Sequence, residues 1–185
     1  VLYVFGPSGV GKSTYIRNYT INYKKVHKNN PLWLVSALAE DDKLDSLGFR
    51  RITIDNKLID DPLTAEDFTY NVDNKKVDGA LIVFDDVDVL TNALKKNVYD
   101  LINMVLKVGR HFNLSVIVTN HDSCSGRETK SILNESQTVT YFPHSGGRSL
   151  KYLLNEYLDL TKEQIHQIKQ TKSRFCTIFK NYPKC

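Results

Sequence analysis

The chain has 185 residues, of which 41% are hydrophobic and only five are proline. This length and composition suit one globular domain over residues 1–185 and exclude a disordered protein. Its 25 basic and 21 acidic residues give a net charge of +4, which neither requires nor excludes a nucleic-acid partner.

The cysteines and the hydrophobic runs indicate where the protein works. Cys124, Cys176 and Cys185 are odd in number and share no metal-ligand spacing, which argues against a disulfide framework and favours a reducing compartment. No apolar run approaches the roughly 18 residues of a membrane span, and no signal peptide is present, so we expect a soluble protein that is not exported. The chain opens without Met on an apolar strand, so we expect the natural protein to extend further toward its N-terminus.

Apolar runs alternate with helical patterns along the chain, which predicts an α/β domain with a mostly parallel sheet flanked by helices. The predicted strands are Leu2–Phe5, Leu32–Ala37, Arg51–Ile54, Ala80–Phe84, Leu114–Thr119, Thr138–Phe142 and Arg174–Phe179. The predicted helices are Ser13–Tyr23, Leu94–Val105, Leu150–Leu158 and a short one that a capping box of Thr161 and Gln164 opens.

The first strand is followed by Gly6-Pro7-Ser8-Gly9-Val10-Gly11-Lys12-Ser13, which matches the P-loop pattern G-x-x-x-x-G-K-[ST]. The glycines of such a loop let backbone N–H groups surround phosphate oxygens, and the next helix presents its positive N-terminus to the same anion. We therefore expect Lys12 to reach the β- and γ-phosphates, Ser13 to ligate Mg²⁺ and Thr14 to contact the α-phosphate. A chance match is expected only a few times in about 10⁵ positions.

Asp85 and Asp86 close the apolar strand Ala80–Phe84, where a Walker B carboxylate belongs. We expect Asp85 to hold a water ligand of Mg²⁺ opposite Ser13, and Asp86 to orient the attacking water as a base. Asp88 is a weaker candidate for the base. The alternative is that two acids merely solvate a strand end, and for Asp86 the sequence leaves that alternative open.

Arg110 lies between the helix Leu94–Val105 and the strand Leu114–Thr119, from which it could reach the γ-phosphate of a neighbouring subunit. From spacing alone, a solvated basic cluster with Lys107 and His111 is the favoured interpretation. We expect no arginine near the P-loop itself, because Arg17 on the following helix should point away from the phosphates.

Asn120 and His121 follow the strand Leu114–Thr119 and can sense the γ-phosphate if that strand lies beside the P-loop strand. Taken alone, they are equally compatible with a loop. Further basic residues are scattered along the chain, and solvated surfaces explain them better than a track for a phosphate backbone. They are Lys24, Lys25, Lys28, Lys95, Lys96, Lys107, Lys169, Lys172, Arg174, Lys180 and Lys184.

The order of these motifs resembles that of the DNA-packaging ATPases of large nucleocytoplasmic DNA viruses, the poxvirus-type branch of the FtsK–HerA superfamily. The resemblance covers essentially the whole chain. The segments that carry it are GPSGVGKST (Gly6–Thr14), LVSALAEDDKLD (Leu34–Asp45), ALIVFDDVD (Ala80–Asp88), GRHFNLSVIVTNH (Gly109–His121), ILNESQTVTYFP (Ile132–Pro143) and the tail Leu153–Pro183.

This resemblance implies a RecA-like P-loop core of the ASCE type, with the strand Leu114–Thr119 between the P-loop and Walker B strands. It implies ATP and Mg²⁺ as ligands and a homo-oligomeric ring that moves double-stranded DNA into a preformed capsid, with capsid or portal components as partners and no membrane. The location it implies is the host cytoplasm, at viral factories, with the virion as a second location. It also supports Arg110 as an arginine finger.

The sequence departs from the superfamily pattern at two places. Asp86 stands where Glu is usual, and its shorter reach leaves the assignment of the base open. A Gln commonly ends the sensor strand, whereas this chain has Asn120 and His121. Alignment favours His121 as the sensor, and side-chain chemistry favours Asn120.

Two other functions remain compatible with the sequence. The loop GPSGVGKST is also similar to that of guanylate-kinase-like enzymes, although such a kinase needs an Arg-rich lid that the chain lacks. Kinases of that class keep the P-loop and Walker B strands adjacent, so strand order discriminates between the two. The other alternative is a nucleotide-binding assembly module without turnover.

Overall fold

The computed structural model describes residues 1–90, 92–123, 126–143 and 148–180, so Cys124, Cys185 and the end of the predicted tail motif lie outside the described residues. All seven predicted strands are present. They are β1 (Leu2–Phe5), β2 (Leu32–Ser36), β3 (Arg50–Thr53), β4 (Ala80–Asp85), β5 (Leu114–Asn120), β6 (Thr138–Tyr141) and β7 (Cys176–Phe179).

The strands form one seven-stranded sheet in the order β3-β2-β4-β5-β1-β6-β7. Every neighbouring pair is parallel except β6 and β7, which are antiparallel. The expectation that the strand after Arg110 separates the P-loop strand from the Walker B strand is therefore confirmed, because β5 lies between β4 and β1. This is a P-loop NTPase fold.

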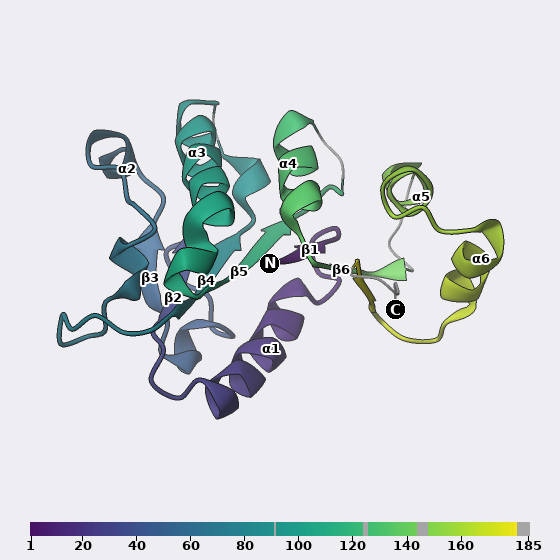
Figure 1. Cartoon of the computed structure of the whole chain (residues 1–185). Helices are drawn as coiled ribbons and strands as arrows, with labels where there is room; N and C mark the ends of the chain where they lie inside the picture. Colours follow the sequence, from purple (N-terminus) through teal and green to yellow (C-terminus); the bar gives the residue numbers. More distant parts are fainter. Residues whose placement is uncertain (91, 124–125, 144–147, 181–185) are drawn as a thin grey trace.

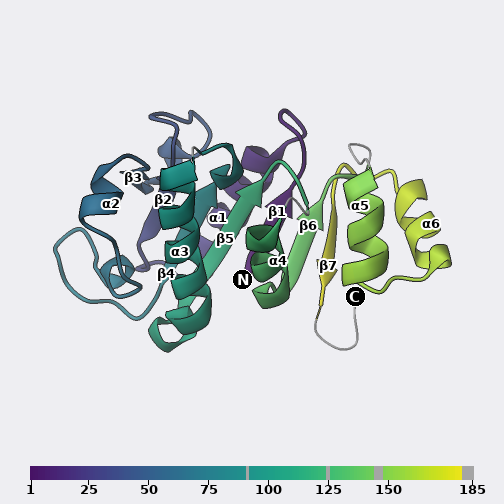
Figure 2. The same cartoon turned by 90° about the horizontal axis from the view of Figure 1, so that it is seen from above.

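Helices cover both faces of the sheet. Figures 1 and 2 show α1 (Lys12–Val26) on one face, and α3 (Asn92–Val108) and α4 (Arg127–Glu135) side by side on the other. Beyond β7 the sheet edge is flanked by α5 (Arg148–Tyr152) and α6 (Lys162–Gln170). The short helix α2 (Lys57–Asp60) lies near the opposite edge. The sequence patterns did not predict α2 or α4.

Two features predicted for the C-terminal third are present in the structure. The expected helix Leu150–Leu158 is present as α5 followed by a π-helical turn, Leu153–Tyr157. The capping box that opens α6 is confirmed, because the Thr161 side chain accepts from the Gln164 backbone and the Gln164 side chain accepts from the Thr161 backbone. Among the described residues, no helix is long and apolar enough to cross a membrane.

The sheet separates two hydrophobic clusters, which explains the continuous apolar runs of its central strands. In β1, Tyr3 and Phe5 pack with the cluster under α3 and α4, whereas Leu2 and Val4 pack with the cluster that holds Ile16 of α1. All six residues of β4 are buried, because both faces of a central parallel strand are covered. The polar residues at the carboxyl ends of β4, β5 and β1 meet at the same end of the sheet.

Gly79, directly before β4, offers a test of this packing. Its φ is 107°, and a Cβ at this position would lie 2.7 Å from the backbone oxygen of Asn113. We expect Gly79→Ala to lower the free energy of unfolding in urea by about 2 kcal/mol or more, because neither backbone can move without disturbing β4 or β5. Gly48→Ala is the control, since Gly48 has φ 76° but nothing within 4 Å of the added Cβ, and strain alone should cost about 1 kcal/mol. Equal losses in the two variants would contradict the steric argument.

Candidate active site

The P-loop connects the carboxyl end of β1 to the amino end of α1. The backbone N–H of Gly6 donates to the Asn120 carbonyl at 3.2 Å, which holds the start of the loop against β5. Gly11 directly precedes the helix with φ 115°, a conformation that side chains with a Cβ rarely adopt. A Cβ on Gly6 would approach the ring of Phe142 to 3.0 Å. These residues form a cradle of backbone at a helix N-terminus, which fits a phosphate group.

Lys12 is held inside this cradle, with only 7% of its surface exposed. Its ammonium Nζ donates to the Gly6 carbonyl at 2.9 Å and lies 3.2 Å from Asp86 Oδ1. A buried ammonium group needs anionic or carbonyl partners, because losing water without replacement is costly. A bound phosphate must therefore compete with Asp86 for Lys12.

Asp85 ends β4 and is 5% exposed. Thr119 on the neighbouring β5 donates its hydroxyl to Asp85 Oδ1 at 2.9 Å and accepts the Asp86 backbone N–H at 2.8 Å. Burial raises the pKa of Asp85 to about 6, and the charge of Asp86 adds to this effect. The Asp85 carboxylate and the Ser13 hydroxyl are the hard oxygen donors that Mg²⁺ prefers, so the donor set fits this ion.

Asp86 leaves the strand in a left-handed conformation, with φ 47° and ψ 47°. This turn directs its carboxylate toward Lys12 on one side and toward His121, whose Nε2 lies 3.6 Å from Asp86 Oδ2, on the other. Asp and Asn adopt left-handed φ more readily than other non-glycine residues. Asp86 is only half-buried, so a water molecule can reach it.

Asp88 is engaged by the end of β5, which disfavours it as the base. Its carboxylate accepts the His121 backbone N–H at 2.8 Å, and its second oxygen lies 3.3 Å from His121 Nδ1. The imidazole of His121 consequently lies between the carboxylates of Asp86 and Asp88. The structure therefore places His121 beside both carboxylates, and its role as a sensor stays a prediction.

Asn120 faces away from the P-loop. Its side chain is fully buried and donates to the hydroxyls of Tyr3, at 3.2 Å, and Tyr99, at 3.5 Å, while its Oδ1 has no hydrogen-bond partner among the described residues. Side chains alternate along a strand, so Asn120 and Thr119 point to opposite faces of the sheet. Of the two predicted sensor residues, His121 is the one near the carboxylates.

Three residues near the loop were not assigned to the site from the sequence. Thr119 anchors both carboxylates, and Lys43 donates to the hydroxyl of Thr14 at 3.4 Å. The Cδ of Arg174 lies 3.9 Å from the position that a Cβ on Gly11 would take. The expectation that no arginine lies near the P-loop is therefore wrong: the turn before β7 brings Arg174 there from the far end of the chain, which no local pattern reveals.

Arg110 lies far from the P-loop of its own chain. It belongs to the short helix Gly109–Phe112 before β5, at the amino end of that strand. Because β5 and β1 are parallel, this end of the sheet is opposite to the edge from which the P-loop emerges. Arg110 is exposed there, beside Glu135 and Gln137. If it contacts a triphosphate, that triphosphate belongs to another subunit.

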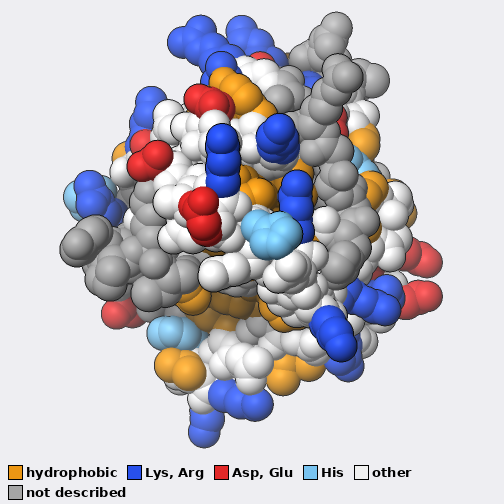
Figure 3. Space-filling view, turned by 90° about the vertical axis from the view of Figure 1, so that its right-hand side faces the viewer, with side chains coloured by type: hydrophobic (Ala, Val, Ile, Leu, Met, Phe, Trp, Pro, Cys, Tyr) orange, Lys and Arg blue, Asp and Glu red, His pale blue; other side chains and the backbone are white. Residues whose placement is uncertain are grey.

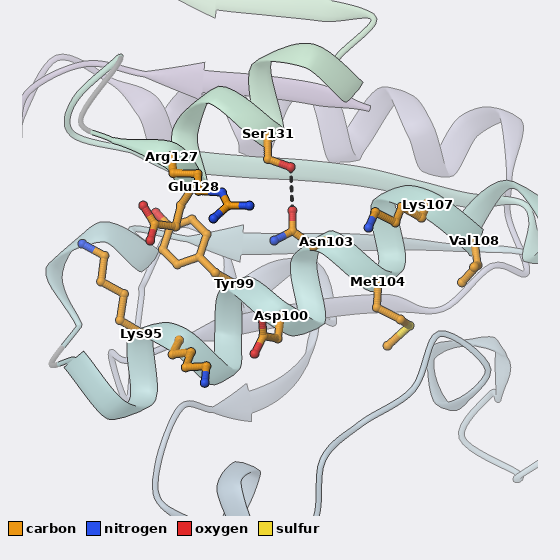
Figure 4. Close-up of a pocket in the computed structure, with 11 residues that line it drawn as sticks. Lys95, Tyr99, Asp100, Asn103, Met104, Lys107, Val108, Arg127, Glu128 and Ser131 are labelled. Atoms are coloured by element: carbon orange, nitrogen blue, oxygen red, sulfur yellow. Dashed lines mark hydrogen bonds between the residues drawn. The ribbon is translucent and has the colours of Figure 1, made fainter.

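A second concave surface, a groove of about 920 Å³, lies between α3 and α4 on the face opposite α1 (Figure 4). Ser131 of α4 bridges it by donating to Asn103 of α3 at 2.8 Å. Tyr99 lines this groove and is also the partner of Asn120, so the groove and the end of β5 share a side chain. Its charged lining residues are Lys95, Lys96, Lys107, Arg127, Asp100 and Glu128.

The basic residues do not form one continuous track in the view of Figure 3. That face, at the end of the molecule where α5 and α6 lie, carries Lys and Arg side chains at several separate places with Asp and Glu among them. On this face, the basic residues are therefore consistent with separate solvated side chains.

Comparison with known proteins identifies one related protein by sequence and several solved structures with a similar fold. The chain is 39% identical over 186 aligned residues to the uncharacterized protein V3 of Sputnik virophage, covering 99% of this chain and 72% of that protein. It belongs to the family of this virophage protein. No protein-family model matches the chain.

Solved structures resemble the chain in fold. The genome packaging NTPase B204 of Sulfolobus turreted icosahedral virus 2, in complex with ATP-γ-S, matches with a TM-score of 0.63 and 15% identity over 97% of this chain and 91% of that one. ATPases 2 and 3 of EccC from Thermomonospora curvata match with a TM-score of 0.53 and 12% identity over 79% of this chain and 31% of that one. At these identities the likeness shows that the three share a fold.

The raised pKa of Asp85 predicts how stability depends on pH. Above pH 6 the folded protein must keep a buried carboxylate ionised beside Asp86, whereas the unfolded chain pays no such cost. We expect Asp85→Asn to raise the free energy of unfolding at pH 8 by about 2 kcal/mol, measured with urea in the absence of nucleotide and Mg²⁺. Between pH 6 and pH 4 the native Asp85 takes up a proton, so the gain should disappear.

The control for this experiment is Asp100→Asn, an exposed acid on α3 that should change stability little at any pH. An Asp85→Asn gain that stays constant from pH 8 to pH 4 would show that the carboxylate charge is not its source.

The position of Asp86 predicts a separation of binding from turnover. We expect Asp86→Asn to reduce hydrolysis of ATP by about 10²-fold or more, because the amide cannot accept a proton from water. Affinity for ATP should stay the same or increase, because Lys12 loses a competing anionic partner. Asn tolerates the left-handed backbone, so the fold should be retained. Single-turnover rates and equilibrium binding of a fluorescent ATP analogue measure the two effects.

Asp122→Asn serves as the control for Asp86→Asn, because Asp122 is an exposed acid that follows His121. If affinity falls as far as the rate does in Asp86→Asn, the residue is a metal ligand or a structural group, and its assignment as the base is incorrect.

Proposed function

We propose that the protein is a Mg²⁺-dependent ATPase that drives double-stranded viral DNA into a capsid. The observation that carries the proposal is the arrangement at one sheet edge: β5 lies between β4 and β1 and places Thr119 and His121 against Asp85 and Asp86, beside the buried Lys12. In the proposed mechanism, these neighbouring groups serve as phosphate cradle, metal ligand and base.

Each group has a distinct task in hydrolysis. The backbone of the loop and Lys12 bind the β- and γ-phosphates, and Ser13 with Asp85 would hold Mg²⁺, which neutralises phosphate charge when bound. When Lys12 turns to the phosphate, Asp86 loses its cationic partner and keeps His121 at 3.6 Å. Asp86 is then available to accept a proton from water. His121, which Asp88 holds in place, keeps the Asp86 carboxylate in position.

The relatives support the packaging part of the proposal. The chain shares its fold with a protein described as a genome packaging NTPase, and its family member V3 belongs to a virophage. We propose that this chain, like that NTPase, serves genome packaging, in the manner of the poxvirus-type branch of the FtsK–HerA superfamily. Viral capsid or portal components are the proposed partners, and the host cytoplasm and the virion the proposed locations.

Strand order argues against the kinase alternative. Guanylate-kinase-like enzymes keep the P-loop and Walker B strands adjacent, whereas β5 separates them here. A nucleotide-binding module without turnover has no need of the base position that Asp86 occupies, so we favour an enzyme over that alternative as well.

The decisive experiment measures phosphate release by the purified protein with Mg²⁺ and ATP, with and without double-stranded DNA. We expect turnover that duplex DNA stimulates several-fold and that Lys12→Ala abolishes. Lys28→Ala, an exposed lysine after α1, is the matched control and should retain the parent rate. No turnover in either condition, with ATP bound, would instead support the assembly module.

Arg110 tests whether the active unit is a ring. Arg110 lies at the amino ends of the strands, whereas its own P-loop lies at their carboxyl ends. It can therefore act only on a neighbouring subunit. We expect Arg110→Ala to bind ATP normally but to lose about 10³-fold in DNA-stimulated turnover, the effect of a typical arginine finger. Lys107→Ala on the same surface should lose little.

Mixing two inactive variants gives a direct measure of action between subunits. Arg110→Ala supplies an intact P-loop and Lys12→Ala supplies an intact finger, so a mixed ring should recover part of the activity. A turnover rate that does not depend on protein concentration and is unchanged in Arg110→Ala would contradict the ring.

A further inference from the structure

A pocket of about 340 Å³ lies beside the P-loop, on the side of α1 that faces the turn before β7. None of the nucleotide-contacting groups assigned above except Thr14 and loop residue Gly11 belongs to it. Its lining residues come from the loop, from three successive turns of α1, from the end of β6 and from the turn before β7. They are Gly11, Thr14, Tyr15, Asn18, Tyr19, Asn22, Phe142, Arg174 and Phe175.

The pocket begins where the phosphate cradle ends. Gly11 and Thr14 line it, and they are the residues of the motif nearest the α-phosphate, the phosphate that carries the nucleoside. From Gly11 to Asn22 the helix rises about 16 Å, which is enough for a ribose and a base to follow the phosphates along α1. The remaining helical lining residues recur at three- and four-residue spacing, so they share one face of α1.

The walls of this pocket are mainly aromatic, and one of them is fixed. The Tyr15 hydroxyl accepts from Thr140 at 3.0 Å and lies 3.4 Å from the Thr177 hydroxyl, so both β6 and β7 hold its ring. Phe175 packs edge-to-face on that ring at 4.9 Å between centroids. Four aromatic side chains, Tyr15, Tyr19, Phe142 and Phe175, line the pocket, which suits a planar group better than a charged one.

Two of these aromatic rings are partly exposed to solvent. Tyr19 is 37% and Phe175 is 42% exposed, although both flank the same pocket. Arg174 stands at the end of the pocket near Gly11, where a guanidinium group can meet phosphate oxygens or stack on a base. Exposed aromatic rings beside a phosphate cradle are the arrangement that binds a nucleobase by stacking.

We infer that this pocket binds the nucleobase and ribose of the triphosphate, with Tyr19 and Phe175 as the stacking residues. The inference rests on the proposed function, because it assigns the base of the same nucleotide whose phosphates the P-loop holds. It assigns a role to the turn before β7: this segment, more than 160 residues away in sequence from the loop, completes the nucleotide site.

The test compares ATP with inorganic tripolyphosphate, which has the phosphates but no base or ribose. Dissociation constants are measured by calorimetry with Mg²⁺ on the parent chain and on Phe175→Ala and Tyr19→Ala. We expect the parent to bind ATP about 10-fold or more tightly than tripolyphosphate. Each variant should weaken ATP binding by about 5- to 20-fold and leave tripolyphosphate binding unchanged.

The matched control is Phe179→Ala, which removes an aromatic ring that is 53% exposed on β7 and does not line the pocket. It should bind both ligands like the parent. Circular dichroism and thermal unfolding of each variant distinguish loss of the base contact from loss of the fold, because an unfolded variant would lose tripolyphosphate binding too.

The outcomes separate this inference from the proposed function. If the parent binds neither ligand, the proposed ATPase function fails. If it binds ATP and tripolyphosphate equally well, or if Phe175→Ala and Tyr19→Ala leave ATP affinity unchanged, the P-loop assignment stands and the base lies elsewhere.

Discussion

The site depends on the buried ammonium group of Lys12. With 7% of its surface exposed, Lys12 must have anionic or carbonyl partners, and without a phosphate it has the Gly6 carbonyl and the Asp86 carboxylate. The same contact keeps the proposed base close to the proposed phosphate ligand. In the proposed mechanism, a triphosphate that binds Lys12 releases Asp86, so that substrate binding and release of the base are coupled through one ion pair. This coupling requires β4 and β1 to end at the same height, and the two hydrophobic clusters on either side of the sheet provide that alignment.

The strand β5 supplies what the P-loop and the Walker B strand lack on their own. Thr119 holds Asp85 and the backbone of Asp86 from one face of the strand, and Asn120 turns to the other face, where it meets Tyr3 and Tyr99. The next residue, His121, leaves the strand and lies between Asp86 and Asp88. Of these three consecutive residues, Thr119 and His121 thus contact the carboxylates, and Asn120 contacts the core beneath α3. Tyr99 also lines the groove between α3 and α4, so a ligand in that groove would lie one side chain away from the end of β5.

Three parts of helix α1 have different roles in the proposed site. Its buried side, with Ile16, packs on the sheet, and its first turn points at the phosphate cradle. A third side carries Tyr19 toward Phe175, which the turn before β7 contributes. Arg110 lies at the opposite edge of the sheet, so a complete site of the proposed kind needs groups from both ends of the fold, and for Arg110 this means a second subunit.

The sequence by itself determined the class of fold and the phosphate end of the site. All seven strands, the loop Gly6–Ser13 and the acids at the end of β4 follow from short-range patterns, because hydrophobic periodicity and glycine spacing are local properties. The tertiary structure decided everything that depends on which distant side chains meet. It brought Thr119 to Asp85, turned Asn120 into the core while placing His121 at Asp86, and carried Arg174 and Phe175 to the P-loop. It also placed Arg110 at the amino ends of the strands, opposite the P-loop. Strand alternation and strand order determine these contacts, and a shift of one residue in the register of β5 would exchange the faces on which Thr119 and Asn120 lie.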